Sequence, residues 1–278
     1  MRRQVIDIGG VATPVVSDGP EADAEAVVCL HGNPGYSADW LDLMPRVADF
    51  ARIVAPDMPG FGDAAKPEGF DYSVPGYTRH LTALLERLGV RRAHLVLHDF
   101  GVGWGLSWAL ANPEKLASLT LVNVGVQPGY RWHVMARIWR MPWLGELSMA
   151  TVTHAAFAAS LKLTNKRALP KAFVDGMYAH FDKGTRRAVL RLYRATDDLG
   201  GLFPPHAEAF RSWTCPVCVV WGAGDPYIDV SYAERQREFF PAAEINLFED
   251  SGHWPHADNP ERFAAVVVPF MRRARAAT

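Results

Sequence analysis

The sequence predicts an α/β fold in which an inserted helical cap covers a mostly parallel central sheet. Three observations lead to this prediction. Apolar runs of strand length alternate with helical patterns up to residue 125, as in the βαβ units that build a parallel sheet. From 126 to 212 strand-like runs give way to helical stretches rich in tryptophan, methionine and alanine. Strand and helix signals then return, so we expect residues 1–125 and 213–278 to form a core domain and 126–212 its cap.

The N-terminal part supplies strand-like runs that alternate with helical patterns. Residues 5–8 and 11–16 flank Gly9 and Gly10 and predict a hairpin at the antiparallel edge of the sheet. The run 26–30 is apolar throughout, which indicates a central strand covered on both faces. The other predicted strands are 52–56, the run from Ala93 to the turn at Asp99, and 116–124. The predicted helices are 41–50, 74–88 and the segment from Asp99 to Asn112.

The cap and the C-terminal part complete the predicted elements. Helical stretches at 132–143, 147–163, 169–181 and 185–193 belong to the cap. Strands are predicted at 215–221 and 244–248, and a final helix at Asn259. Cys215 and Cys218 have the spacing of a redox or metal pair, but they open a buried strand and no second pair exists. We therefore interpret them as structural.

Composition limits the partners that the chain can have. Of 278 residues, 49% are hydrophobic and 21% charged, which is ordinary for a soluble globular protein. The 29 lysine and arginine residues nearly balance 30 aspartate and glutamate residues, so attraction to nucleic acid or to a membrane is not expected. No apolar run suits a membrane span or a signal peptide. We expect a cytoplasmic protein that binds a small, largely apolar molecule without metal or cofactor, with a homodimer as one option for its oligomeric state.

Asp99 stands at a turn between a buried strand and the glycine-rich start of a helix. Such a turn lifts one side chain above the sheet and points the first free N–H groups of the helix at it. A carboxylate needs no base to act as a nucleophile, and it forms an ester when it attacks a saturated carbon. The expected electrophile is therefore an epoxide or a carbon that bears a halide, more than a carboxylic ester.

Four motifs, taken in order, resemble those of one enzyme family. They are His31-Gly32-Asn33-Pro34, Asp57-Met58-Pro59-Gly60-Phe61-Gly62, His98-Asp99-Phe100-Gly101 and Gly252-His253-Trp254. Together they resemble the aspartate-nucleophile branch of the α/β-hydrolase superfamily, which holds epoxide hydrolases and haloalkane dehalogenases, and they imply an α/β-hydrolase fold. Two residues depart from the pattern. Leu97 stands where these turns usually carry glycine, which should crowd the corner, and Phe100 stands where tryptophan is usual.

The resemblance implies a catalytic triad in the chain order nucleophile, acid and histidine. Asp99 is then the nucleophile, Asp225 the acid, and His253 the base that takes a proton from water. Asp229 competes with Asp225, but its place ahead of 230–232 favours a helix N-cap. His256 is expected to line the histidine loop.

The same motifs imply the substrate-binding residues. The backbone N–H groups of Asn33 and Phe100 are expected to form the oxyanion hole; the alternative for 31–35 is a tight turn with nothing bound. His31 and Trp254 belong to these motifs and are expected at the substrate site. The Asn33 side chain resembles the halide-binding residue of haloalkane dehalogenases.

Tyr193 is the candidate proton donor in the cap. It lies in a stretch that resembles the tyrosine-arginine element of epoxide hydrolases, where the tyrosine donates a hydrogen bond to the epoxide oxygen. A phenol with a pKa of about 10 can protonate an alkoxide at neutral pH; the alternative is an ordinary tyrosine of an amphipathic helix. The branch normally has a second cap tyrosine, for which Tyr130, Tyr178 and, more weakly, His154 are candidates.

We therefore predict an epoxide hydrolase, with a haloalkane dehalogenase as the alternative. Phe100 offers no side-chain donor to a halide, whereas Tyr193 offers a proton to an alkoxide. Asn33 is the main argument for the dehalogenase. A catalytically silent member of the fold would have lost a triad residue, and none is missing. Ester hydrolysis would need a serine nucleophile, and the nearest, Ser107, lies within a predicted helix.

Overall fold

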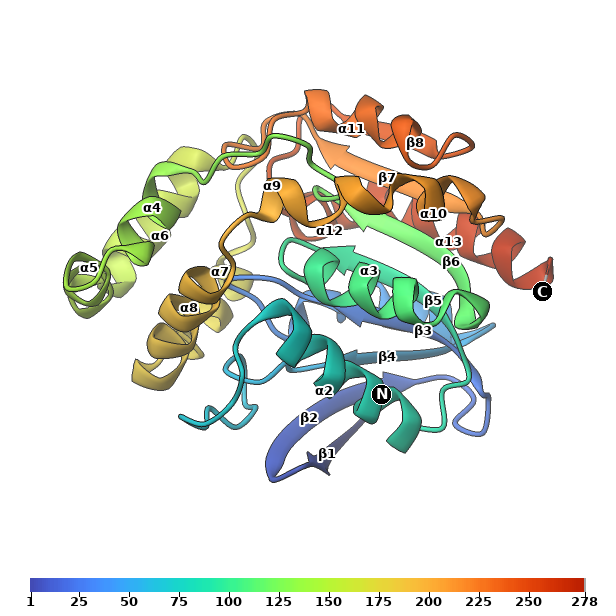
Figure 1. Ribbon diagram of the computed structural model, residues 1–278, viewed down its shortest axis with the longest axis horizontal. Coiled ribbons are helices and arrows are strands. Elements are labelled where there is room, and N and C mark those ends of the chain that lie inside the picture. Colours follow the sequence, from blue (N-terminus) through green and yellow to red (C-terminus); the bar gives the residue numbers. More distant parts are fainter. Residues whose placement is uncertain (278) are drawn as a thin grey trace.

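The computed structural model describes residues 1–277 and confirms the mostly parallel sheet (Figure 1). Its eight strands are ordered β1-β2-β4-β3-β5-β6-β7-β8. β2 pairs antiparallel with β1 and with β4, which confirms the predicted antiparallel edge, and the other pairs are parallel. The strands are β1 (Arg2–Ile8), β2 (Val11–Asp18), β3 (Glu25–Leu30), β4 (Arg52–Pro56), β5 (Arg92–His98), β6 (Leu116–Val122), β7 (Val217–Gly222) and β8 (Glu244–Phe248).

Helices cover both faces of the sheet, so the central strands β3 to β7 are buried along almost their whole length. α2 (Val74–Arg87) and α3 (Gly101–Ala111) lie on one face (Figure 1), and α1 (Met44–Ala48) and α13 (Pro260–Ala276) lie on the other. Successive residues of a strand point to opposite faces. Val28 accordingly packs in the core under α2 and α3, whereas Val27 packs in the core under α1 and α13.

Two predicted helices differ from those in the structure. The segment 41–50 holds the short helix α1, preceded by a single 3₁₀ turn at Ser37–Trp40. The stretch 147–163 holds two helices, α5 (Leu144–Thr151) and α6 (His154–Thr164), so the prediction of one helix was wrong. The chain is extended at Thr153, whose side chain accepts a hydrogen bond from the Ala156 N–H and thereby starts a new helix.

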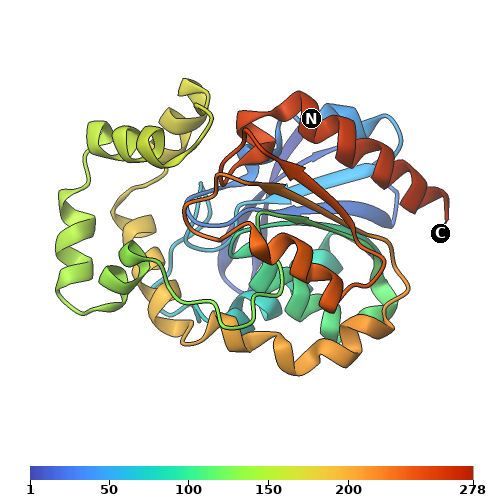
Figure 2. The same ribbon diagram turned by 90° about the horizontal axis from the view of Figure 1, so that it is seen from above.

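The segment between β6 and β7 is helical, and no strand occurs there among the described residues. Five of its helices project from the sheet on one side (Figures 1 and 2), while α9 (Leu199–Leu202) and α10 (Ala207–Ser212) run back along the core. The boundaries of the cap stay a prediction. The projecting helices are α4 (Val134–Arg140), α5, α6, α7 (Lys171–Ala179) and α8 (Lys183–Ala195).

The loops that follow β3, β5, β7 and β8 meet beneath the projecting helices. They carry residues 31–35, Asp99, Asp225 and His253, respectively. Open α/β sheets bind ligands at this edge, outside the carboxyl ends of the strands. The last elements, α11 (Ser231–Arg235) and α12 (Pro255–Asp258), flank the loops that carry Asp225 and His253. Within residues 1–277, no helix is both long and apolar enough to cross a bilayer.

Candidate active site

Asp99 occupies the sharp turn between β5 and α3. Its backbone lies in the left-handed region, with φ of 48°, a conformation that non-glycine residues adopt rarely and mostly at functional sites. The turn is tight because the Val102 N–H donates to the Asp99 carbonyl at 3.0 Å. Gly32 makes room for the carboxylate, because a Cβ there would lie only 2.2 Å from Asp99 Cβ. The side chain therefore stands up from the sheet as predicted.

Leu97 fits the corner because a glycine faces it from α3. A Cβ atom on Gly105 would lie 2.3 Å from Leu97 Cδ2, closer than carbon atoms can approach. The family usually has a glycine at the strand position that Leu97 occupies here. In this chain the glycine that leaves the necessary space is Gly105 of the helix. The expected crowding at Leu97 is relieved at Gly105, and the side chain is fully buried.

The structure brings Asp99, His253 and Asp225 into a line. His253 Nδ1 lies 2.7 Å from Asp225 Oδ2, and His253 Nε2 lies 3.6 Å from Asp99 Oδ2. Asp229, the alternative acid, instead accepts a hydrogen bond from the Ser231 N–H at 2.9 Å, at an exposed position near the start of α11. The N-cap of α11 is Val230 and no side chain caps the helix, so the prediction that Asp229 is an N-cap is wrong.

Asp225 is held by three donors besides the histidine. Its Oδ1 accepts from the N–H groups of Tyr227 (2.8 Å) and Ile228 (3.1 Å), and its Oδ2 accepts from Asn123 Nδ2 (2.8 Å). Asn123 follows β6 with a φ of 48°, and its Oδ1 accepts from the Gly222 N–H. Asn123 was not predicted as a site residue, although a polar side chain at the end of an apolar strand could have indicated it.

Charges in the triad reinforce one another. Burial raises the pKa of Asp99, but the hydrogen bond and charge of His253 and the Asn33 N–H outweigh it and lower the pKa to about 2. Burial lowers the pKa of His253, but the carboxylates of Asp225 and Asp99 outweigh it and raise the pKa to about 10. The resting site therefore holds an ionised Asp99 beside a protonated His253.

The loop that carries His253 is fixed from two directions. The His253 N–H donates to Asn165 Oδ1 at 3.0 Å, and the His253 carbonyl accepts from His98 Nε2 at 2.9 Å. Asn165 Nδ2 also donates to Asp258 Oδ2, which accepts the Gly252 N–H. Asn165 lies between α6 and α7, so the cap holds the histidine loop of the core. No sequence pattern near Asn165 predicts this role.

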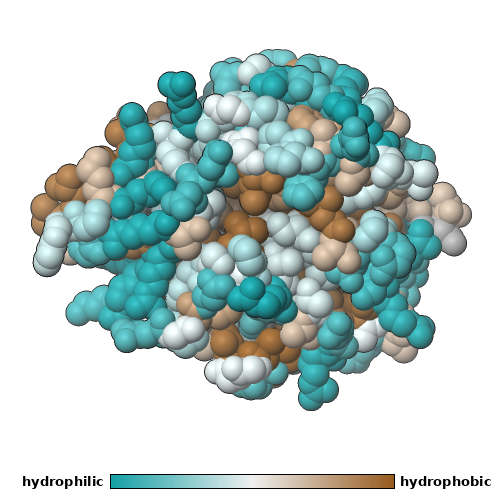
Figure 3. Space-filling view, in the orientation of Figure 1, coloured by the Kyte–Doolittle hydropathy of each residue, from teal (hydrophilic) through white to brown (hydrophobic). Residues whose placement is uncertain are grey.

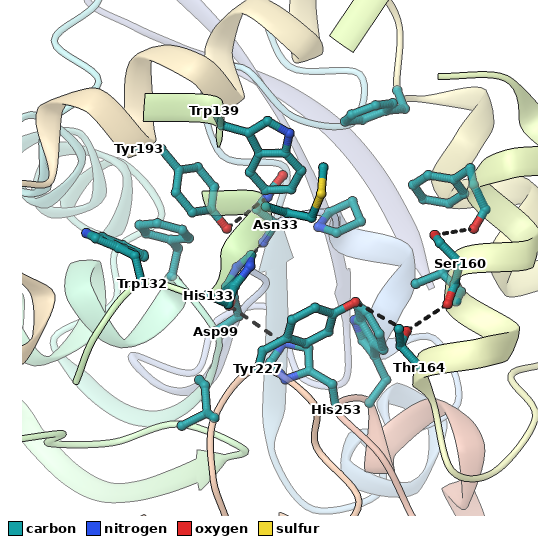
Figure 4. A pocket seen from close by; sticks show the side chains of 18 of the residues that line it. Asn33, Asp99, Trp132, His133, Trp139, Ser160, Thr164, Tyr193, Tyr227 and His253 are labelled. Atoms are coloured by element: carbon teal, nitrogen blue, oxygen red, sulfur yellow. Dashed lines mark hydrogen bonds and ion pairs between the residues drawn. The ribbon is translucent and has the colours of Figure 1, made fainter. Parts of the chain in front are cut away.

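The backbone N–H of Asn33 donates to Asp99 Oδ1 at 2.7 Å. The other expected oxyanion donor, the Phe100 N–H, makes no hydrogen bond among the described residues, which leaves it available at the start of α3. Asn33 Nδ2 donates to the hydroxyl oxygen of Tyr193 at 3.3 Å, which links the loop after β3 to α8 (Figure 4). Asn33 thus contacts Asp99 through its backbone and the cap through its side chain.

An apolar cavity of about 310 Å³ lies above Asp99. Rings from the core and the cap surround Tyr193, with Phe100, Trp132 and Trp139 at centroid distances of 4.9, 5.2 and 5.0 Å. Burial raises the pKa of Tyr193 well above its ordinary value, so its phenol stays protonated. Asn33, Phe100, Trp254 and His253 also line the cavity, as predicted for a substrate site.

His31 does not line the cavity. Its Nε2 accepts from the Met58 N–H at 3.0 Å, and its Nδ1 lies 2.9 Å from the Gly32 carbonyl oxygen. The prediction that His31 binds substrate is therefore wrong, because its ring is fully buried behind the loop that it holds. His256 is also buried, stacked on Trp40 at 4.7 Å.

Of the three candidates for a second cap donor, only Tyr130 lines the cavity. Tyr178 donates to the Val152 carbonyl, and His154 contacts Asp175. Neither side chain lines the cavity, so the prediction that one of them is the second cap donor is wrong. Four polar side chains that were not predicted from the sequence also line the cavity: His133, Ser160, Thr164 and Tyr227. Figure 4 shows these four in the same cavity as Asp99 and His253.

The chain resembles enzymes of several activities. The sequence profile described as alpha/beta hydrolase fold matches residues 25–260. A cis-3-alkyl-4-alkyloxetan-2-one decarboxylase of Xanthomonas campestris pv. campestris is 28% identical over 95% of this chain and 93% of its own. A haloalkane dehalogenase of Mesorhizobium japonicum is 29% identical over 90% of this chain and 85% of its own. The crystal structure of epoxide hydrolase A from Mycobacterium thermoresistibile shares the fold, with a TM-score of 0.83 at 21% identity over 98% of both chains.

Proposed function

Because the chain belongs to the α/β-hydrolase fold family, we propose that it opens epoxides to vicinal diols through an ester formed on Asp99. The observation that carries this proposal is the hydrogen bond from Asn33 Nδ2 to the Tyr193 oxygen. That bond occupies a lone pair of the phenol and leaves the phenolic proton free to be donated into the cavity. An oxygen leaving group needs such a proton, whereas a halide ion does not.

In the first step, the Asp99 carboxylate attacks a ring carbon of the epoxide. A new ester bond to carbon forms while the ring carbon–oxygen bond breaks, and Tyr193 gives its proton to the oxygen that leaves. Asp99 is ionised at neutral pH because its pKa is lowered to about 2. Tyr193 holds its proton until the alkoxide appears, since burial raises its pKa.

In the second step, water hydrolyses the ester with His253 as the base. Esterification removes the negative charge of Asp99, one of the two carboxylates that keep His253 protonated. The pKa of His253 then falls, and the proton that it releases replaces the one that Tyr193 lost. Neutral His253 takes a proton from water, and the Asn33 N–H stabilises the oxyanion, a contribution of about 3 kcal/mol for one such donor. The hydroxide adds to the ester carbonyl carbon, and the bond from this carbon to the substrate oxygen then breaks. The departing diol oxygen takes the proton of the added hydroxyl group, so Asp99 returns as a carboxylate and His253 keeps the proton that it took from water.

Haloalkane dehalogenation is the second candidate, and the Asn33 side chain favours it. Nδ2 of Asn33 carries a second N–H beside Asp99, and a relative named haloalkane dehalogenase is 29% identical to this chain. The first step would be the same, with halide in place of the alkoxide. Phe100, however, has no side-chain donor for the second contact that a halide requires. We therefore rank this activity below epoxide hydrolysis.

The relative named as an oxetan-2-one decarboxylase suggests a further test substrate. Its substrate also has a strained ring with a carbon–oxygen bond, so it shares with an epoxide an oxygen leaving group. A cis-dialkyl oxetan-2-one therefore belongs beside an epoxide and a bromoalkane in any assay of this chain.

We assign the second cap donor to Tyr130 or His133. Nδ1 of His133 accepts from the Ala136 N–H at 3.2 Å, so in the neutral ring the proton resides on Nε2. Burial lowers the pKa of His133, which keeps the ring neutral and its Nε2–H available as a donor. Tyr130 carries an equivalent O–H.

Trapping the ester tests the proposal. The variant His253→Gln should be alkylated by styrene oxide but should not release the product, so its intact mass should rise by the mass of the epoxide. Peptide mapping should place the adduct on Asp99. The double variant Asp99→Asn with His253→Gln is the control and should stay unmodified. A bromoalkane adduct together with bromide release by the wild type would favour the dehalogenase, and absence of any adduct would overturn the covalent mechanism.

Tyr193 is tested separately from Asp99. Tyr193→Phe should lower the rate of diol formation at least 100-fold, because general acid catalysis is typically of this size. Tyr178→Phe is the matched control, since Tyr178 belongs to the same cap but lies outside the cavity lining. Equal rates in the two variants would contradict the role given to Tyr193.

A further inference from the structure

The outward sides of α4 and α5 form an apolar face that nothing covers within residues 1–277. All of its side chains are exposed. Two lie three residues apart on α4, two lie three residues apart on α5, and two lie in the short connection between the helices. Figure 3 shows hydrophobic side chains at this end of the molecule, bordered by hydrophilic ones. The face, called the α4–α5 face below, consists of the apolar residues Val134, Met141, Trp143, Leu144 and Leu147 and of the exposed Arg137, which lies among them.

Trp143 is the most exposed side chain of this face. It is 86% accessible and occupies the corner between the two helices with a φ of 69°. A large aromatic residue in the left-handed region is strained, and this one gains almost no packing in return. The fold itself therefore gives no reason for tryptophan at the corner. An amphipathic ring of this kind suits the boundary between water and lipid.

The net charge of −1 is divided unevenly along the chain. Residues 126–212 contain 13 lysine and arginine residues but only 6 aspartate and glutamate residues. Within residues 1–277, no carboxylate lies in ion-pair distance of the exposed Arg131 and Arg137. Glu146, the acidic residue of α5, is neutralised by Arg194 at 2.6 Å. The surroundings of the α4–α5 face are therefore positive.

The mouth of the cavity opens beside this face. Met135 is 40% accessible and also lines the cavity, and it lies next to Val134 of the α4–α5 face. Across the opening, Ala156 and Ser160 of α6 are likewise both exposed and part of the lining.

We propose that the α4–α5 face docks on an anionic lipid surface, with the cavity mouth at the headgroup level. Trp143, Leu144 and Leu147 would enter the interface, and Arg131 and Arg137 would contact lipid phosphates. An apolar substrate dissolved in the bilayer could then enter the cavity without crossing bulk water. The expectation that a membrane is no partner rested on the net charge of the whole chain, which averages a basic cap with an acidic core.

Vesicle co-sedimentation tests this docking without any assay of activity. The wild type should bind vesicles of phosphatidylcholine with one quarter phosphatidylglycerol, and should bind pure phosphatidylcholine vesicles much less. Trp143→Asn combined with Leu147→Ser should lower the partition coefficient at least tenfold; asparagine is chosen because it tolerates the left-handed backbone. Arg137→Gln should lower it about fivefold, and about 0.5 M salt should weaken wild-type binding.

Val5→Ser is the matched control. Val5 is an exposed apolar residue of β1, an edge strand of the sheet that lies outside the cap, so this variant should bind vesicles like the wild type. Absence of binding to anionic vesicles, or binding that the α4–α5 variants leave unchanged, would overturn the proposal. A dimer that Trp143→Asn with Leu147→Ser converts to a monomer, without vesicle binding by the wild type, would assign the face to a second copy of the chain instead.

Discussion

At the scale of single residues, the proposed mechanism couples Asp99 to His253 through their opposite charges. In the resting protein each stabilises the charge of the other across 3.6 Å. The ester removes one negative charge, and the imidazolium loses the partner that held its proton. The nucleophilic step itself thus prepares the base for the hydrolytic step.

This coupling predicts that acid slows the hydrolytic step and leaves the nucleophilic step unchanged. The pKa of Asp99 is about 2, so attack on the epoxide should proceed unchanged between about pH 8 and about pH 5. In the ester, the pKa of His253 falls below its resting value of about 10, and protonation at the lower pH then blocks hydrolysis. The fraction of wild-type enzyme carrying the ester in the steady state should therefore rise at pH 5, as measured by rapid quenching and intact mass. A fraction that stays constant or falls would show that His253 is not the base.

Residues that carry the chemistry were easier to predict than those that hold them in place. Asp99, Asp225 and His253 lie in motifs that follow strands, so their residue types and spacing were informative. Asn123 and Asn165 are single asparagines whose hydrogen bonds join segments roughly 90 to 100 residues apart in the sequence. No local pattern encodes such a contact, because it depends on how the strands and the cap are packed.

At the scale of elements, the corner between β5 and α3 shows how one unusual residue is compensated by another. Leu97 fills the space that a side chain at 105 would need. The sequence predicted crowding at Leu97, but it did not show that Gly105 leaves the space in which the Leu97 side chain fits. The two positions are neighbours only because α3 packs directly on the strand that precedes it.

The variant Gly105→Ala should therefore destabilise the protein. Its methyl group would overlap Leu97, and overpacking of this kind costs about 1–3 kcal/mol. Adding Leu97→Ala frees the space and should make the double variant less destabilised than the sum of the two single variants predicts. Chemical denaturation of the four proteins measures the free energies of unfolding. Strict additivity would contradict the proposed fit of the two residues.

The break between α5 and α6 shows where helical periodicity fails as a guide. Helix-forming residues continue on both sides of Val152 and Thr153, so the sequence predicts one helix. The structure ends α5 there and caps α6 with Thr153. Residues of both helices, Met149 and Ala156 among them, line the same cavity.

At the scale of the whole molecule, the cap and the core share one site. The core supplies Asp99, Asp225 and His253, and the cap supplies Tyr193, most of the apolar wall and Asn165. Parallel strands and an inserted helical segment could be predicted because each has a periodic pattern. The way the cap sits on the core could not, because it depends on contacts between segments that are distant in sequence.

Asn165 gives the sharpest test of this coupling. Asn165→Ala removes the acceptor of the His253 N–H and a donor to Asp258, so the histidine loop loses its contact with the cap. We expect the ester to form at the wild-type rate but to be hydrolysed about 100-fold more slowly, since small displacements of a catalytic group cost factors of this size. Amide hydrogen exchange should become faster at 250–258 and remain unchanged in the central strands. Asn246→Ala on β8 is the control, because its side chain bonds only within the sheet edge. If Asn165→Ala slowed both steps equally, or left exchange in the loop unaltered, the cap would not be positioning His253.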